Sequence, residues 1–338
     1  MTDVAATDAK ARRAARGTRH ELEAQLEGYR TELTGHCYRM LGGAFEAEDA
    51  VQETMVRAWR ALDRFEGRSA LRSWLYSIAT NVCFDMLGSK QRRARPMDLG
   101  PASSADTALG APLVESTWVE PIPDPRVVPQ EGDPAELAAQ RETVRLAFIA
   151  ALQQLPARQR AVLILREVLR WKAAEVAELL DTTVASVNSA LQRARATLAD
   201  SDLATTEPFA PMDDDQQTLL GQYVSAFEQY DIDALISLIE KDAAFSMPPY
   251  ALWLRGHDDI SRFYVGQGAA CRGSRLIPTA ASGLPAFGHY KPSSTGSGYE
   301  PWALQVIEIS AGRIVGLHHF LDTERMFPLF GLPPRLDG

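Results

Sequence analysis

Residues 182–199 combine small polar side chains with arginines and contain no acidic residue. At helical spacing, one side of this stretch is apolar, whereas the other carries hydroxyl, amide and guanidinium groups on Ser186, Asn188, Ser189, Gln192 and Arg193. Such groups can hydrogen-bond the edges of base pairs in the major groove of DNA. The stretch therefore predicts a DNA-reading helix, although a plain helical hairpin would show the same pattern.

A second set of chemically capable side chains lies in the last third of the chain. Aromatic, imidazole and carboxylate groups there could line a cavity, at Trp253, Tyr264, Trp302, His318 and Asp322. Asp322 or a histidine could act as a general base. However, His318 and His319 are neighbours on a predicted strand, so at most one faces a cavity, and the spacing reveals no pair of buried acids. We expect no enzymatic activity, with a domain that binds or converts a small molecule as the alternative.

Metal and cofactor chemistry have little support in the sequence. The three cysteines, Cys37, Cys83 and Cys271, are too widely spaced for a metal site or a disulfide framework. We therefore expect no cofactor and no metal. No window approaches 18 uncharged apolar residues, and no apolar stretch follows the basic residues near the N-terminus. These features predict a cytoplasmic protein without membrane contact.

The charge of the chain changes along its length. The 338 residues carry 35 Lys and Arg against 44 Asp and Glu, a net charge of -9. This total divides into +3 over residues 1–95, -7 over 96–136, +3 over 137–200 and -8 over 201–338. Two mildly basic segments thus flank an acidic one, in a chain long enough for two or three domains. The pattern permits two nucleic-acid-binding modules, although a charge of +3 is too small to establish them.

Hydrophobic periodicity indicates which elements would position these groups in the first two hundred residues. Residues 21–88 predict helices, one of them with an apolar face formed by Val51, Met55, Trp59 and Leu62. The next four dozen residues, rich in Pro, Gly, Ser and acids, predict a linker, within which residues 118–124 should lie against a surface. Helices are then expected at residues 161–170, 173–180 and 184–198, the last with Val184, Val187, Leu191, Ala194 and Leu198 on its apolar stripe. Two short helices and a tight turn are typical of a helix-turn-helix.

The last third of the chain predicts an α+β domain. Helices are expected at residues 219–230 and 233–240, and strands at 243–247, 275–280, 302–309 and 313–320. Helices followed by a curved antiparallel sheet favour a cone-shaped domain with a cavity.

Several of these segments resemble bacterial sigma factors of the sigma-70 class, in the extracytoplasmic-function group. Residues 49–59, DAVQETMVRAW, and 65–81, FEGRSALRSWLYSIATN, are similar to region 2 of that family. Residues 155–195, from LPARQR to VNSALQRAR, are similar to region 4. The tail resembles the SnoaL-like (NTF2-like) domain fused to a subset of these proteins, at 233–235, 246–249, 253–256 and 330–333.

The resemblance implies a multidomain fold with two all-α modules, an acidic linker and a cone-shaped α+β domain. The expected boundaries are a flexible N-terminus at 1–20, region 2 at 21–95, the acidic linker at 96–136, region 4 at 137–200, a short linker at 201–214 and the SnoaL-like domain at 215–338.

The resemblance also implies partners for each module. Core RNA polymerase would bind a polar face of region 2 at Asp49, Gln52, Glu53, Arg57 and Arg60. The -10 promoter element would be melted and held by Phe65, Arg68, Arg72 and Asn81, because an unstacked base needs an aromatic wall and an edge-reading amide. Further phosphate contacts are expected from Lys90, Arg92, Arg93 and Arg95.

Region 4 would read the -35 element through the five polar residues of the 182–199 stretch. Asn188 and Ala190 stand where the family often has basic residues, which lowers the electrostatic share of binding. The linker would enter the polymerase active-site cleft. The resemblance thus implies an alternative sigma factor that is regulated in cis through contacts of its C-terminal domain with the sigma modules. A helix-turn-helix regulator independent of polymerase is the other alternative, which the region 2 match disfavours.

Overall fold

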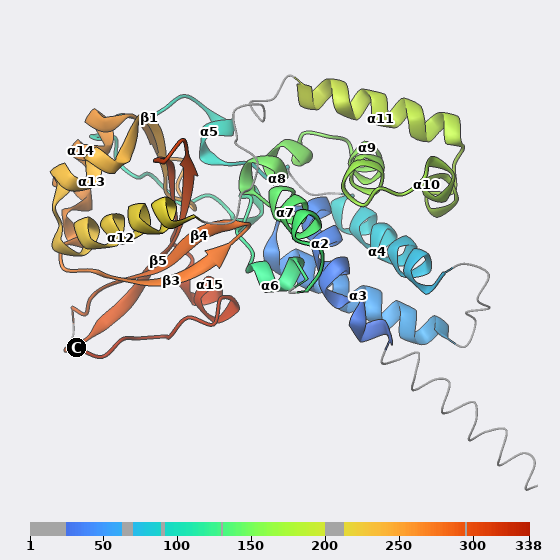
Figure 1. Cartoon of the computed structure of the whole chain (residues 1–338), viewed down its shortest axis with the longest axis horizontal. Helices are drawn as coiled ribbons and strands as arrows, with labels where there is room; N and C mark the ends of the chain where they lie inside the picture. Colours follow the sequence, from blue (N-terminus) through green and yellow to red (C-terminus); the bar gives the residue numbers. More distant parts are fainter. Residues whose placement is uncertain (1–24, 63–69, 89–91, 130, 200–212, 295) are drawn as a thin grey trace, which may run out of the picture. The chain divides into compact units, whose positions relative to one another are not determined.

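The computed structural model describes residues 25–62, 70–88, 92–129, 131–199, 213–294 and 296–338 (Figure 1). These residues form two compact units. The first draws its described residues from Met1–Lys90, Pro125–Gln130 and Leu155–Ala196. The second draws them from Gln91–Asp124, Glu131–Gln154 and Thr197–Gly338. Each unit has its own buried core.

The first unit is helical. Its helices are α2 (Arg30–Leu41), α3 (Ala44–Ala61), α4 (Leu71–Leu87), α9 (Ala157–Leu163), α10 (Ala173–Leu179) and α11 (Val184–Ala199), and a π-helical turn, Ile164–Val168, follows α9. Gly42, with a φ of 74°, ends α2 in the left-handed conformation and donates its N–H to the Tyr38 carbonyl, so that α3 can begin two residues later. The expected continuous α-helix over residues 161–170 is wrong, because α9 ends at Leu163 and the backbone continues as a π-helical turn from Ile164.

A buried arginine joins the helices of the first unit. Arg160 is 4% exposed and lies on α9. Its guanidinium group donates to the carbonyl of Met40, at the end of α2, and to the carbonyl of Leu155, at 3.1 Å. Both carbonyls thereby gain a charged partner away from water, which ties region 155–168 to α2.

The second unit contains a six-stranded sheet with the order β2-β1-β6-β5-β4-β3. The strands are β1 (Ile239–Ser246), β2 (Trp253–Arg255), β3 (Arg275–Ala281), β4 (Leu284–Pro292), β5 (Tyr299–Ser310) and β6 (Arg313–Phe320). The β1–β6 pair is parallel and the other neighbours are antiparallel. Helices α12 (Asp214–Gln229), α13 (Ile232–Leu238) and α14 (His257–Val265) pack against it, and α15 (Thr323–Leu329) follows β6 (Figure 1).

This arrangement confirms the α+β character of the C-terminal domain but adds two strands to the expectation. Neither β2 nor β4 is predicted by the sequence pattern, and β1 begins four residues earlier than expected. The expected helix over 233–240 ends at Leu238, because Ile239 already pairs with Ile314 in the sheet.

The acidic stretch at residues 96–136 contains regular structure. It contains α5 (Pro96–Leu99), a 3-10 turn at Glu115–Thr117, α6 (Asp124–Val127) and the start of α7 (Pro134–Glu142), which is followed by α8 (Leu146–Gln153). Every residue from Trp118 to Pro123 is buried, so the expectation that this fragment lies against a surface is confirmed. Its backbone pairs with the β3–β4 turn, where Ser282 donates its N–H to the Ile122 carbonyl at 2.8 Å.

Polar side chains cross the interior of the second unit. The Tyr223 hydroxyl donates to Gln305 Oε1 at 2.9 Å, and Gln305 Nε2 lies 3.2 Å from His289 Nδ1. His289 Nε2 lies 2.9 Å from the Ser274 hydroxyl. All four side chains of this hydrogen-bonded series are buried, and each has a partner. The polar groups therefore rigidify the interior and do not leave an open cavity there.

Acid should destabilise this unit through its histidines. Burial lowers the pKa of His319 to about 3 and holds that of His289 well below its usual range. Below the unfolded-state pKa of about 6.5 the unfolded chain therefore binds more protons than the folded one, and stability falls by about 1.4 kcal/mol per pH unit for each histidine. In denaturant titrations from pH 7 to pH 4, the variant His319→Phe should lose about 1.4 kcal/mol less per pH unit than the wild type. Equal slopes would contradict this origin of the acid sensitivity.

Candidate functional site

The exposed face of α3 forms one continuous stripe. Polar and charged groups along it are Asp49, Gln52, Glu53 and Arg60, all exposed. Val56 is 40% exposed and Trp59 is 52% exposed within the same stripe. The expectation that Trp59 packs on the buried side of the helix is therefore wrong. The face combines a polar border with an apolar centre, which is the composition of a protein-binding surface.

Arg57 borders this stripe, half-buried. Its Nε donates to Glu53 Oε1 at 2.7 Å, and its Nη1 donates to Asp85 Oδ2 at 3.0 Å. These two hydrogen bonds, led by the one to Glu53, raise the pKa of Arg57. The side chain is thereby oriented between α3 and α4, and a partner that uses it must share it with both carboxylates.

The predicted promoter-melting residues lie on and before α4. Phe65 and Arg68 lie outside the described residues. Asn81 is exposed on α4, whereas Arg72 is half-buried and forms an ion pair with Glu32 at 2.8 Å. The Arg72 guanidinium also lies over the ring of Tyr76, 5.2 Å from its centroid. Asn81 is thus available to a ligand as it stands, whereas Arg72 would have to exchange partners.

Of the arginines expected at phosphates, two are engaged in the second unit. Arg93 is 6% exposed, donates to the Trp118 carbonyl and lies 3.8 Å from Glu120 Oε1. Arg95 binds Asp98 at 3.0 Å in the first turn of α5. Arg93, expected at a phosphate, is therefore buried, and its side chain binds the linker at Trp118 and Glu120. Arg92 is exposed, and Lys90 lies outside the described residues.

All five predicted base-reading residues lie on the exposed side of α11. These are Ser186, Asn188, Ser189, Gln192 and Arg193. Val187, Leu191 and Ala194 are buried on the opposite side. Val184 is 43% exposed, so its expected place on the apolar stripe is wrong. The Thr183 hydroxyl accepts a hydrogen bond from the Ser186 N–H at 3.1 Å and caps the first turn, which fixes where the polar face begins.

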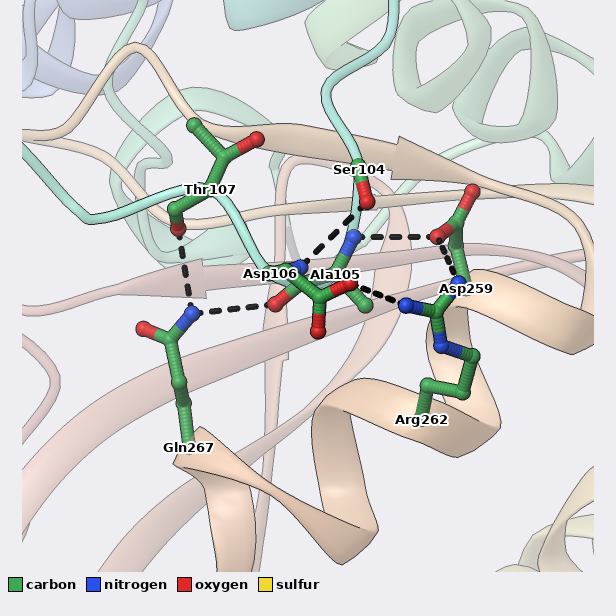
Figure 2. Close-up of polar contacts among 7 residues, drawn as sticks. All are labelled: Ser104, Ala105, Asp106, Thr107, Asp259, Arg262 and Gln267. Atoms are coloured by element: carbon green, nitrogen blue, oxygen red, sulfur yellow. Dashed lines mark hydrogen bonds and ion pairs between the residues drawn. The ribbon is translucent and has the colours of Figure 1, made fainter.

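The C-terminal domain holds a linker segment by side chains that no sequence pattern predicts (Figure 2). Asp259 Oδ1 accepts the Ala105 N–H at 2.9 Å. Gln267 Nε2 donates to the carbonyls of Ala105 and Thr107, at 2.9 and 3.0 Å, and Arg262 forms an ion pair with Asp106. We call this arrangement the linker clasp: residues 104–107 of the linker with Asp259, Arg262 and Gln267.

Further contacts extend the clasp along the linker. The Trp253 indole N–H donates to the Gly100 carbonyl at 2.9 Å, and the Ser103 N–H donates to the Trp253 carbonyl at 2.8 Å. Beyond residue 107, Arg325 forms an ion pair with Glu115. The linker is therefore bound to the C-terminal domain at successive points between Gly100 and Asp124.

The five residues expected around a cavity do not come together. Trp253 binds the linker through its indole N–H. Asp322 Oδ2 lies 3.6 Å from Arg325 Nη1 at the start of α15. Trp302 is 37% exposed, with the Lys291 ammonium group over its ring. Tyr264 is buried beside Phe227 and Phe245. His318 and His319 face opposite sides, as expected: His318 Nδ1 lies 2.8 Å from the Ser246 hydroxyl, whereas His319 packs on the ring of Phe245.

Among the described residues, no helix is long and apolar enough to cross a bilayer. The cysteines Cys37, Cys83 and Cys271 are all free and buried.

Comparisons with known proteins cover both helical modules and most of the chain. The family model for sigma-70 region 2 matches residues 26–93, and that for sigma-70 region 4 matches residues 145–198. The extracytoplasmic-function (ECF) RNA polymerase sigma factor SigG of Mycobacterium tuberculosis is 44% identical over 326 residues, which cover 94% of this chain and 85% of SigG. SigJ of the same organism is 28% identical over 250 residues, 72% of each chain. The crystal structure of Mycobacterium tuberculosis SigJ is similar with a TM-score of 0.58 at 21% identity, covering 92% of this chain and 99% of that one.

Proposed function

The chain belongs to the ECF sigma factors of bacterial RNA polymerase, and we propose that it directs core polymerase to specific promoters and is regulated in cis by its C-terminal domain. In this function it binds the polymerase, reads the -35 element and melts the -10 element in the cytoplasm, without a cofactor and without catalysing a reaction itself. The proposal is carried by the presence of both sigma modules, and it is supported by the exposure of the predicted polar residues on α3 and α11.

The polymerase would bind the exposed stripe of α3. Trp59 and Val56 supply apolar area, and Gln52, Glu53 and Arg60 surround them with polar groups. An aromatic anchor inside a polar border is the arrangement that carries most of the binding energy in protein interfaces. The proposed face is thus more apolar than the sequence pattern predicts.

Promoter DNA would contact both modules. Asn81 is exposed on α4 and would hydrogen-bond an unstacked base of the -10 element, with Phe65 and Arg68 as its predicted neighbours. On α11, Gln192 and Asn188 can bond adenine edges and Arg193 can bond guanine in the -35 element. Because few cations lie on this face, base contacts would contribute more to binding than phosphate contacts do.

Regulation in cis would act through the linker. The resemblance implies that the linker enters the polymerase, whereas here the linker clasp and the contacts beside it bind the linker to the C-terminal domain. One segment cannot occupy both places. The C-terminal domain would therefore restrain the free protein until the linker is released to the polymerase.

Opening the linker clasp tests this regulation. In the variant Asp259→Ala, Arg262→Ala, Gln267→Ala, each lost side chain removes about 0.5–1 kcal/mol of linker binding, since these contacts are exposed or only part-buried. Because the three losses together amount to about 1.5–3 kcal/mol, promoter-specific transcription by limiting core polymerase should then rise by about tenfold or more.

The matched control is Arg255→Ala, Asp258→Ala, which removes one base and one acid that are exposed on the same domain. It should leave transcription unchanged. A folded clasp variant with unchanged or lower transcription would contradict restraint through the linker, while transcription by the wild type would still support the sigma function.

A further inference from the structure

A pocket of about 660 Å³ opens in the second unit, beside the closed interior of the domain. One wall is α12, with Leu220, Gly221 and Val224. The opposite wall is the β3–β4 hairpin, including Leu276 and Phe287. Its volume lies within the range of about 300–1,000 Å³ that is typical of sites for small molecules.

The charged groups of this pocket come from residues 124–145, which precede the sheet in the sequence. Asp124 begins α6, Arg141 lies on α7, and Arg145 precedes α8. Asp124 Oδ1 accepts the Gly283 N–H at 2.7 Å, while burial raises the pKa of the Asp124 carboxyl. Arg145 Nη1 forms an ion pair with Glu142 Oε1 at 3.6 Å. Two guanidinium groups and one carboxylate thus line the pocket. The carboxylate accepts the N–H of the hairpin turn, and Arg145 is also paired with Glu142 beside the pocket.

The α12 wall contains a glycine that packing does not require. A Cβ atom at Gly221 would have no neighbour within 4 Å, so no close approach of another group explains the residue. Glycine costs about 1 kcal/mol relative to alanine inside a helix. A residue that lowers helix stability without improving packing is typical of functional positions. Here the missing side chain of Gly221 leaves the pocket wide.

The interior of the domain offers no comparable space to a ligand. Tyr223, Gln305 and His289 are buried and hydrogen-bonded to one another. None of the five residues that the sequence predicts around a cavity lines the 660 Å³ pocket. A small molecule would therefore bind at the edge of the domain, against residues 124–145 as well as the sheet.

We propose that this pocket binds an anionic amphiphile, with its apolar body between α12 and the β3–β4 hairpin and its carboxylate or equivalent head at Arg141 and Arg145. The apolar walls contribute affinity by removing hydrocarbon from water, and the two guanidinium groups select a negative head. The proposal concerns binding alone and does not depend on transcription.

Binding of decanoate to the full-length protein, measured by isothermal titration calorimetry, tests the site. Saturable binding with one molecule per chain is expected, and decanol, which has the same body without the charge, should bind about tenfold more weakly. Gly221→Phe should abolish binding by filling the pocket, whereas Gly221→Ala, its matched control, should retain it. Arg141→Ala, Arg145→Ala should lower the affinity for decanoate about tenfold and leave that for decanol unchanged.

The proposal would be overturned by a lack of saturable binding or by full binding to Gly221→Phe. Equal affinity for decanoate and decanol would overturn the anionic head. Since calorimetry needs no polymerase, these outcomes are independent of whether the chain initiates transcription. An unchanged unfolding temperature in each variant shows that lost binding does not reflect lost folding.

Discussion

Replacing Trp59 with alanine is expected to weaken binding of core RNA polymerase about 30-fold. A buried tryptophan at the centre of an interface typically contributes about 2 kcal/mol or more, which corresponds to this factor. Trp59 is 52% exposed in the isolated chain and lies within the polar stripe of α3, so it has apolar area to lose on docking. Competition binding against a labelled sigma factor would measure the effect.

The stability of the chain should change little in this variant, because half of the side chain is already in water. Trp302→Ala is the matched control, since Trp302 is 37% exposed on β5 of the C-terminal domain. It should bind polymerase as the wild type does. If Trp59→Ala also bound with wild-type affinity, the α3 stripe would not be the docking face.

Replacing Arg160 with alanine is expected to destabilise the first unit by about 3–5 kcal/mol. The change leaves the carbonyls of Met40 and Leu155 buried without their charged donor, at a cost of about 1–3 kcal/mol each, and it also opens a cavity. A loss of this size is a large part of the stability of a small unit. The midpoint of denaturant unfolding, followed by tryptophan fluorescence, should fall accordingly.

Two further variants test whether the loss of stability comes from the buried hydrogen bonds of Arg160. Arg160→Lys keeps the charge but has one nitrogen in place of a fork, so it should restore only part of the stability. Arg158→Ala removes an exposed arginine two residues earlier and should have little effect. A midpoint for Arg160→Ala equal to that of Arg158→Ala would show that the buried hydrogen bonds do not hold the unit together.

The polar face of α11 was predictable because its exposed and buried residues differ in type. Asn188, Ser189 and Gln192 alternate at helical spacing with Val187 and Leu191, and the structure separates the two groups as expected. On α3, residue type did not distinguish the exposed side from the buried side. There the buried side consists mainly of Ala47, Ala50, Thr54 and Ala58, small residues with a weak hydrophobic signal, so Trp59 seemed by spacing to belong to the core.

Other features depend on contacts between residues far apart in the sequence. The strand β4 contains Pro285 and Gly288, both poor strand formers, and it forms because β3 and β5 pair with it on either side. The linker clasp joins residues about 150 positions apart, and Asp259 and Arg262 are ordinary surface residues of a helix in the sequence alone. The large pocket escaped prediction for the same reason, since α7 reaches it from outside the domain.

Transcription in vitro tests the central claim most directly. Purified core polymerase would be given the full-length chain on a pool of genomic templates, and the 5′ ends of the transcripts would be mapped. The sigma function predicts transcripts that start at a limited set of promoters sharing -35 and -10 sequences, that are absent with core polymerase alone, and that are lost with Trp59→Ala. If the chain failed to bind core polymerase, or if its addition produced no promoter-specific start, the assignment of this function would be contradicted.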